Sequence, residues 1–462
     1  MTIVILGAGR VGLQLARQLI SEHKEVIVIE KDSQKAQDVS RQLDCFTVND
    51  NGNSLEALEK ARIEKADFFV SVTESDEINM IACALVSSAF KKPITIARVR
   101  NLDYSRTWNK KTDFLGIDYI INPEIEVAHA IVRAVDCGAV SSVVDFETSD
   151  LQMRNIAVEK GSLFDGMLLR DLRSKLDIPF IVAVIVREED SIIPTGSTEL
   201  KADDQLWVLA EKDHLTTLLK FMNKPPIYLK NIVIAGGGNI GMYIARFFLE
   251  EDTKNKSGFF ERFFKILRNP HKRNVHIVES NYARCKELAE LLPGVQITNA
   301  DISEEQILEE GRFNTYDLLI AATGNQELNI VTAAHARKGG ISRTMALVKK
   351  SSNTLIARNL GVDVAVSINE TLVNSIQKII RKDVAKSVYY FSDSNLELLE
   401  WPVSSHPEMA GHTIKELHLP RNSLIMMITR EGKHLIPHGD LALCGGDCLM
   451  LITTKDNVRE LE

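Results

Sequence analysis

Residues 1–20 read MTIVILGAGRVGLQLARQLI, an apolar run followed by a glycine-rich turn and a helix-like pattern. Gly7, Gly9 and Gly12 give the spacing G-x-G-x-x-G. In such a turn the first glycine permits a sharp change of direction, the second lets a pyrophosphate approach the backbone, and the third lets helix and strand pack closely. The helix start would offer free N–H groups to the phosphates. The stretch therefore predicts a nucleotide-binding α/β domain, with a plain tight turn as the alternative.

An acidic residue at the end of the next apolar run supports this interpretation. The run EVIVIE ends at Glu30, 18 positions after Gly12. A carboxylate in this place accepts hydrogen bonds from the ribose hydroxyls of an adenosine and repels a 2′-phosphate. We therefore expect NAD(H) rather than NADP(H), and the alternative is a solvated carboxylate at a strand end.

Three further positions suit a nucleotide. Asn51 lies in the polar turn DNGN after the third apolar run, where polar groups reach an adenine. Thr73 follows the fourth run, beside the point at which ligands bind in open α/β sheets. Arg98 comes at the end of the fifth run, where a guanidinium would neutralise a pyrophosphate. Each of the three is otherwise an ordinary turn residue or part of a surface ion pair.

The chain then repeats itself, which indicates a tandem architecture. Residues 231–250 read NIVIAGGGNIGMYIARFFLE, and a run VHIVE ends at Glu279 as VIVIE ends at Glu30. The segment DLLIAATGNQELNIVTAAH matches DFFVSVTESDEINMIACAL of the first half. The parts that follow also match, through a Pro-x-Gly turn and an acidic turn before a last apolar run. The order is A–B–A′–B′.

Units A and A′ alternate apolar runs with helical patterns, which predicts βαβ crossovers and a parallel sheet with helices on both faces. Units B and B′ are short and β-rich. The expected fold class is α/β, with two Rossmann-like doubly wound parallel sheets, each followed by a small α+β subdomain. Pro225 and Pro226 mark the central linker. The expected domains are 1–134, 135–225, 226–384 and 385–462.

The second copy differs from the first in its charges and in its length. Asp301 takes the place of Asn51, and Leu347 takes the place of Arg98, with Lys349 as a weaker substitute. The second site is therefore expected to bind a different nucleotide, to bind more weakly, or to stay empty. Glu279 follows Gly241 by 38 positions because of an insertion, roughly TKNKSGFFERFFKILRNPHK. This basic, phenylalanine-rich stretch suits a partner or membrane surface, or a helix extension folded onto its own domain.

Composition narrows the function classes. The 462 residues carry a net charge of −8, which argues against a dedicated nucleic-acid binder. The six cysteines show no C-x-x-C spacing, as expected for thiols in a reducing cytoplasm. No signal peptide or membrane span is evident, so we expect action at a membrane only through a partner. Four histidines cluster in B′ without counterparts in B, which suggests surface residues rather than a metal site: His412, His418, His434 and His438.

These features together resemble the TrkA family, the cytoplasmic regulatory subunits of bacterial and archaeal Trk potassium-uptake systems. The resemblance rests on GAGRVG with Glu30, VTESDEINM, IARVR, GGGNIG and the doubled layout, and it covers the whole chain. Each A unit looks like an RCK (KTN) nucleotide-binding domain and each B unit like its C-terminal subdomain. Asn51, where the family often has Asp, and the insertion after Glu250 depart from the pattern.

The resemblance implies a function and a set of binding residues. It implies NAD(H) in the first lobe and NAD(H), ATP or ADP in the second. It also implies a tetramer with a ring of eight RCK units, docked on the inner face of the membrane against a TrkH/TrkG-type potassium-conducting subunit. The nucleotide-contacting positions would be Gly7, Gly9, Arg10, Val11, Gly12, Glu30, Asn51, Thr73, Arg98, Gly236, Gly238, Asn239, Ile240, Gly241, Glu279, Asp301 and Thr323.

The competing class is an NAD-dependent oxidoreductase. Such an enzyme needs a substrate domain and an acid/base group near the nicotinamide. Units B and B′ are too small to enclose a substrate, and neither carries a repeated catalytic side chain. We therefore expect a switch and no catalytic residues, because a nucleotide that prefers one arrangement of paired domains shifts their population.

Overall fold

The computed structural model describes residues 1–101, 103–104, 115–136, 143–145, 151–176, 178–188, 190–221, 229–254, 273–304, 315–382, 389–390, 396–454 and 457. The chain divides into two units, and each unit combines two separate parts of the sequence. The first unit contains Met1–Ala139 and Leu229–Ile380, and the second contains Val140–Tyr228 and Arg381–Glu462. The repeated nucleotide-type domains are therefore grouped together, and so are the repeated small modules.

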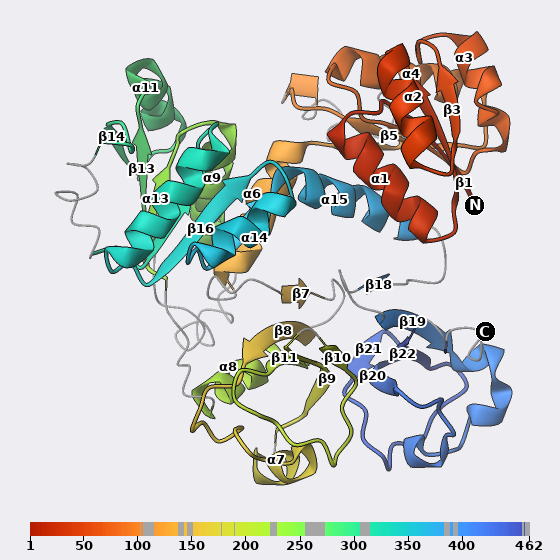
Figure 1. Ribbon diagram of the computed structural model, residues 1–462, viewed down its shortest axis with the longest axis vertical. Helices are drawn as coiled ribbons and strands as arrows, with labels where there is room; N and C mark the ends of the chain where they lie inside the picture. The colour runs from red at the N-terminus through yellow and green to blue at the C-terminus, as the bar shows by residue number, and fades with distance from the viewer. Residues whose placement is uncertain are drawn as a thin grey trace. The chain divides into compact units, whose positions relative to one another are not determined.

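The first lobe of the first unit is built on a six-stranded sheet in which all neighbouring strands are parallel (Figure 1). The strand order is β3-β2-β1-β4-β5-β6. The chain adds strands on one side of β1 and then, from β4 on, on the other side, and the crevice at this switch point is where open α/β sheets bind ligands. The expected doubly wound sheet is confirmed. The strands are β1 (Thr2–Leu6), β2 (Glu25–Glu30), β3 (Phe46–Asn49), β4 (Phe68–Ser71), β5 (Ile94–Arg98) and β6 (Tyr119–Ile121).

Helices cover both faces of this sheet, because residues of β1 feed two separate cores. Ile3 and Ile5 pack with Leu15 of α1, whereas Val4 and Leu6 belong to the opposite cluster. A continuous apolar strand is what a sheet buried on both faces requires. The helices on the two faces are α1 (Arg10–Ser21), α2 (Ser33–Gln42), α3 (Leu55–Lys60), η1 (Ile63–Lys65) and α4 (Asp76–Ala89), and the lobe ends in α6 (Pro123–Asp136), which packs elsewhere.

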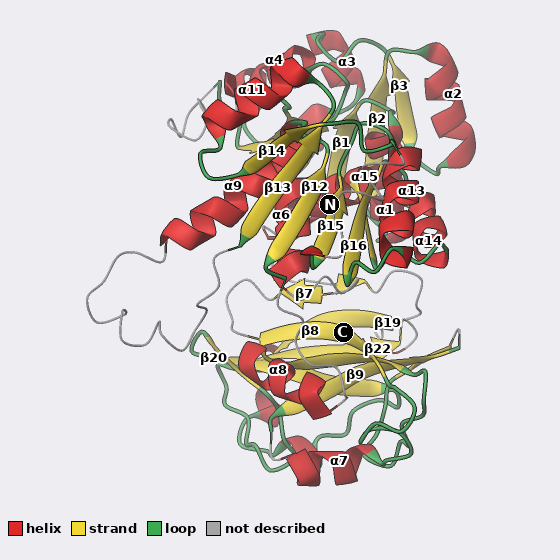
Figure 2. Cartoon of the chain, turned by 90° about the vertical axis from the view of Figure 1, so that its left-hand side faces the viewer, coloured by secondary structure: helices red, strands yellow, loops and turns green. Residues whose placement is uncertain are grey.

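The second lobe repeats this architecture with the order β14-β13-β12-β15-β16-β17. Figure 2 shows β14, β13, β12, β15 and β16 side by side. The strands are β12 (Asn231–Ala235), β13 (Asn274–Glu279), β14 (Gln296–Asn299), β15 (Leu318–Ala321), β16 (Arg343–Val348) and β17 (Val364–Ser367). The helices are α9 (Asn239–Lys254), α11 (Tyr282–Leu291), α13 (Gln326–Lys338), α14 (Ser352–Asn359) and α15 (Ile368–Lys382). The insertion is described only up to Lys254, where α9 ends, and residues 255–272 lie outside the described residues.

The two lobes exchange their last helices. Helix α15 of the second lobe places Leu372, Val373 and Ile376 in the core cluster of the first lobe (Figure 1). Helix α6 of the first lobe packs on α9 of the second, where the rings of His129 and Phe247 stack with centroids 4.1 Å apart. Each lobe therefore buries apolar surface that the other supplies, which links their geometry.

The second unit contains the two small modules. One sheet has the order β10-β9-β11-β8-β7 and the other β18-β19-β22-β20-β21. The first module consists of β7 (Val143–Asp145), β8 (Leu151–Ala157), α7 (Leu169–Leu176), β9 (Phe180–Arg187), β10 (Asp190–Ile192), β11 (Gln205–Glu211) and α8 (Lys212–Phe221). The second consists of β18 (Tyr389–Tyr390), β19 (Leu396–Pro402), η3 (Val403–Ser405), η4 (Pro407–Met409), η5 (Ile414–Glu416), β20 (Ser423–Arg430), β21 (Lys433–Leu435) and β22 (Cys448–Thr454). One apolar cluster joins both modules and includes Met153, Leu209, Met426 and Ile452.

Each small module is closed by an equivalent ion pair between a partly exposed arginine and a buried aspartate. Arg187 Nη2 lies 2.7 Å from Asp204 Oδ2, and Arg430 Nη2 lies 2.7 Å from Asp447 Oδ2. These are the acidic turns that repeat in the sequence, so the turns close the modules. Among the described residues no helix is long and apolar enough to cross a membrane, and no cluster of acidic, His and Cys side chains is arranged to hold a metal ion.

Candidate functional site

Two glycines of each loop are required by the fold itself. Gly7 has φ +102° and Gly236 has φ +112°, a region that other residues rarely enter. A Cβ on Gly12 would lie 1.9 Å from the Gly7 carbonyl oxygen, and one on Gly241 would lie 2.1 Å from that of Gly236. The first and third glycines of the motif therefore make the turn and the close approach of helix to strand.

Neither the backbone conformation nor the packing of the protein requires glycine at the middle position of the motif. A Cβ on Gly9 or on Gly238 would meet no described atom within 4 Å. Gly9 has φ −66° and ψ −177°, a conformation open to any residue. Within the described part of the chain, no side chain caps the start of α1 at this residue. The loop thus leaves bare backbone and free N–H groups facing open space, the arrangement that suits a pyrophosphate.

Glu30 is held against the glycine loop. It is 7% exposed, and its Oε2 accepts a hydrogen bond from the Ala8 N–H at 2.7 Å while Oε1 accepts one from the Asp32 N–H at 2.9 Å. Glu279 repeats this, with Gly237 N–H at 2.7 Å and Asn281 N–H at 2.8 Å. A carboxylate has about four acceptor positions, so each retains capacity for a ribose hydroxyl.

A buried asparagine joins the two remaining elements of the first site. Asn79, on α4, is 0% exposed. Its Oδ1 accepts hydrogen bonds from the Thr73 N–H at 2.8 Å and the Thr73 hydroxyl at 2.7 Å, and its Nδ2 donates to the Arg98 carbonyl at 2.8 Å. Thr73 in turn lies against the glycine loop, 3.1 Å from the position of a Cβ on Gly7. The structure therefore brings Thr73, Arg98 and the loop together.

Arg98 is a cation with unused hydrogen-bonding capacity. Its Nη1 donates to the Thr73 carbonyl at 3.1 Å, while its buried Nε has no partner among the described residues. Burial, and then the charge of Arg100, lower the pKa of Arg98. An anion at this point would relieve both effects, so the side chain fits a phosphate.

The second site keeps the framework but not this cation. Asn329 accepts from the Thr323 N–H at 2.9 Å and donates to the Leu347 carbonyl at 2.9 Å, which confirms that Leu347 is the counterpart of Arg98. A pocket of about 170 Å³ lies beside this loop. It is lined by residues that include Gly238, Asn239, Ile240, Thr323, Lys349 and, from helix α6 of the first lobe, Glu124. Asn239 Nδ2 donates to Glu124 Oε2 at 3.0 Å.

The remaining predicted positions differ in exposure. Asn51 and Asp301 are exposed, and their side chains accept hydrogen bonds within their own turns, from the N–H groups of Asn53 and Ser303. Arg10 is exposed on the first turn of α1, and Val11 is buried beneath it.

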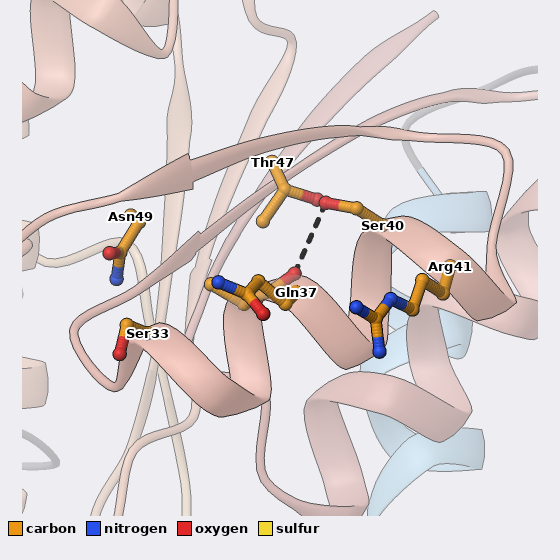
Figure 3. A pocket seen from close by; sticks show the side chains of 7 residues that line it. Ser33, Gln37, Ser40, Arg41, Thr47 and Asn49 are labelled. Atoms are coloured by element: carbon orange, nitrogen blue, oxygen red, sulfur yellow. Dashed lines mark hydrogen bonds between the residues drawn. The ribbon is translucent and has the colours of Figure 1, made fainter.

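A hollow of about 330 Å³ lies over α2 and β3 (Figure 3). Its lining contains Ser33, Gln37, Arg41 and Thr47, and the Ser40 hydroxyl beside them donates to the Ala36 carbonyl at 3.1 Å. No predicted nucleotide residue lines it.

Sequence reasoning assigned no role to the residues that position the site, although Asn79 lies in the motif VTESDEINM that carries the family resemblance. Asn79 and Asn329 tie the strand ends together, and Asn49 and Asn299 tie β3 and β14 to the ends of β2 and β13. A signal was available, because each of these asparagines stands at the same place in both copies of the repeat. Arg284, which donates to the Gly237 carbonyl at 2.9 Å, was missed because its position depends on the packing of α11 against the loop.

Known proteins match the chain along its length. The TrkA-N domain model matches residues 3–123 and 261–368, and the TrkA-C domain model matches residues 153–223 and 398–462. The Trk system potassium uptake protein TrkA of Azorhizobium caulinodans is 27% identical, over 100% of this chain and 98% of that relative. A Trk system potassium uptake protein TrkA homolog of Archaeoglobus fulgidus is 29% identical, over 100% and 99%.

Solved structures agree on the fold. The GsuK channel bound to NAD has a TM-score of 0.58 at 19% identity and covers 100% of this chain and 78% of that one. The GsuK RCK domain has a TM-score of 0.58 at 19% identity and covers 99% and 93%. At this identity the likeness speaks for the fold alone. The two domain models alternate along the chain in the order of its internal repeat, and the chain belongs to the family of proteins built from tandem TrkA-N and TrkA-C domains.

Proposed function

We propose that the protein is a nucleotide-binding regulatory subunit that gates a Trk-type potassium-conducting membrane protein from the cytoplasmic side. The observation that carries this proposal is the glycine loop of the first lobe, whose middle glycine faces open space beside Glu30 and the incompletely bonded guanidinium of Arg98. The family membership supplies the context, because the relatives are named as potassium-uptake proteins.

The proposed ligand of the first lobe is NAD(H). Glu30 accepts the ribose, the N–H groups at the start of α1 and Arg98 hold the pyrophosphate, and Thr73 lies at the strand end beside them. The second lobe takes NAD(H), ADP or ATP at Gly236, Gly238, Gly241 and Glu279. In this proposal residues 1–134 and 226–384 are the nucleotide-binding domains, and residues 135–225 and 385–462 are their C-terminal subdomains.

The proposed mechanism uses the exchanged helices. Because α15 packs in the core of the first lobe and α6 packs on α9, a nucleotide that favours one arrangement of a lobe biases the other lobe as well. Four chains would assemble into a ring of eight RCK units on a TrkH/TrkG-type subunit. The ring would transmit the change in lobe geometry to the pore.

The test is potassium flux into vesicles that hold the membrane subunit of the same organism, with and without the full-length protein. We expect NAD+, NADH, ATP or ADP to change the flux, and Arg98→Ala to reduce the response to NAD(H). Flux that no nucleotide changes would contradict the gating role. Steady oxidation of NADH with a small carbonyl substrate would instead favour an oxidoreductase.

A further inference from the structure

A cation lies beside the glycine loop of the second lobe. It comes from helix α11, on the other side of the loop from Leu347, the counterpart of Arg98. Arg284 is the third residue of α11, and its N–H is bonded to the capping Asn281 Oδ1 at 3.1 Å. Its Nε donates to the Gly237 carbonyl at 2.9 Å, and its Nη2 lies 3.4 Å from Asn239 Oδ1. Asn239 is the first residue of α9, so the guanidinium lies next to the N–H groups that a phosphate would use.

The glycine loop of the second lobe leaves room for helix α11 to pack closely on it. In the first lobe Ala8 and Val39 pack in one cluster, and their counterparts in the second lobe are Gly237 and Leu288. A Cβ on Gly237 would lie 2.5 Å from Leu288 Cδ1, so the smaller residue is needed where α11 carries the larger one. The helix thus packs directly on the loop, and only 20% of the Arg284 side chain is exposed. The counterpart Lys35 is exposed.

The second lobe lacks two cations that stand at the site of the first lobe, and it lacks one acidic cap. The first lobe has Arg10 on its loop and Arg98 on β5, and the second lobe has Asn239 and Leu347 at these positions. The acidic cap Asp32 of α2 is replaced by the neutral Asn281 of α11. Arg284 is held by Glu287, whose Oε2 lies 2.6 Å from Nη1. Of the five N–H donors of a guanidinium, the two on Nη2 make only long contacts, to Asn239 Oδ1 at 3.4 Å and Met242 Sδ at 3.7 Å, and one on Nη1 is left over, so the group keeps donor capacity for a ligand.

We propose that Arg284 is the phosphate-binding cation of the second site and holds the phosphate next to the adenosine ribose. This inference rests on the proposed function, because it requires a nucleotide in the second lobe. Glu279 lies on the same side of the loop, where it accepts from the Gly237 N–H. Ribose and adjacent phosphate are therefore gripped from the α11 side, whereas the first lobe grips its pyrophosphate from the β5 side.

The test is calorimetric titration of the full-length protein with ADP. Gly9→Asp and Gly238→Asp first assign the binding events, because each places a carboxylate in one loop only. Arg284→Ala should weaken binding to the second lobe about tenfold, the loss typical of a hydrogen bond to a charged group. Lys35→Ala is the matched control, and the first-lobe event should be the same in Arg284→Ala as in the wild type.

A purely structural role of Arg284 is separated from a role in binding by two further readings. Arg284→Gln keeps a donor for the Gly237 carbonyl without the charge, and we expect it to bind ADP as weakly as Arg284→Ala, with Arg284→Lys in between. The affinity of the wild-type second site should fall with added salt more steeply than that of Arg284→Gln. Wild-type affinity and salt dependence in Arg284→Gln would overturn the inference alone. A Gly238→Asp variant that loses no binding event would overturn the proposed second nucleotide site as well.

Discussion

The side-chain nitrogen of Asn79 lies 2.8 Å from the carbonyl oxygen of Arg98 and donates a hydrogen bond to it. The same carboxamide accepts two hydrogen bonds from Thr73, so one buried side chain sets the spacing of two strand ends and one helix. Asn329 makes the equivalent bonds to Thr323 and Leu347. The framework of the site is therefore present in both lobes, while its cation is not.

Asn79 is buried behind the site, so its replacement should weaken nucleotide binding without removing a ligand contact. Asn79→Ala leaves buried donors and an acceptor without partners, and we expect a loss of about 2 kcal/mol in the free energy of unfolding. NAD+ affinity should fall as well, because Thr73 and Arg98 lose their common anchor. Denaturant unfolding and calorimetry measure the two effects. Asn329→Ala is the control. It should lower the free energy of unfolding by a similar amount and leave the NAD+ affinity of the first lobe intact. An equal loss of first-lobe NAD+ affinity in both variants would refute a local role of Asn79.

Glu30→Ala should weaken NAD+ binding by about tenfold, because the ribose hydroxyls lose their hydrogen bonds to a charged carboxylate. It also frees the Ala8 and Asp32 N–H groups, so the loop itself loosens. Glu30→Gln keeps an amide oxygen for one of these donors and should fall between the wild type and Glu30→Ala. Calorimetric affinities that are the same for all three proteins would show that the carboxylate does not face the ribose.

Arg98→Ala should weaken every ligand that carries a pyrophosphate in the first lobe, NAD+ and ADP alike, because the guanidinium acts on the phosphates and not on the base. Adenosine, which lacks phosphates, should bind the variant and the wild type equally. Competition titrations against a fluorescent nucleotide measure these ratios. A variant that changed only the preference between adenine and guanine nucleotides would disprove the role assigned to Arg98.

The ion pair of the last module predicts a dependence of stability on acid. The hydrogen bond from Arg430 lowers the pKa of Asp447 below its ordinary value, against the opposing effect of burial. The pair's contribution to stability is therefore complete above the unfolded-state pKa of about 4 and is lost as the pH falls through the lower folded-state pKa. Asp447→Asn should lose this acid sensitivity. Unfolding free energies between about pH 2 and 5 test it, and parallel curves for both proteins would contradict it.

Most of the fold could be predicted because local sequence patterns indicate its strands, helices and turns. Continuous apolar runs, glycine spacing and the internal repeat located the strands and both loops, because a parallel strand such as β1 is buried on both faces. The placement of Thr73 and Arg98 at strand ends also followed from the sequence, and the structure adds that the two strands are neighbours.

The remaining features depend on contacts between distant segments. Nothing local to Asn239 indicates that it bonds Glu124 of the other lobe, and nothing in α15 shows that its apolar face packs in the first lobe. Arg284 belongs to the same class, because its position depends on the fit of Leu288 against Gly237. The chain's own repeat narrows such cases, but it shows which positions recur and not what they touch.

The middle glycine of the first loop leaves open the space that a bound pyrophosphate would occupy. A methyl group at Gly9 would meet no described atom, so Gly9→Ala should change the free energy of unfolding by no more than about 1 kcal/mol. Calorimetric titration of the full-length protein with NAD+ tests this role of Gly9. We expect the wild type to bind NAD+ in the first lobe. We expect Gly9→Ala, still folded, to bind it at least about tenfold more weakly because the methyl group occupies the place of the phosphate. Equal NAD+ affinity in the two proteins would contradict this role.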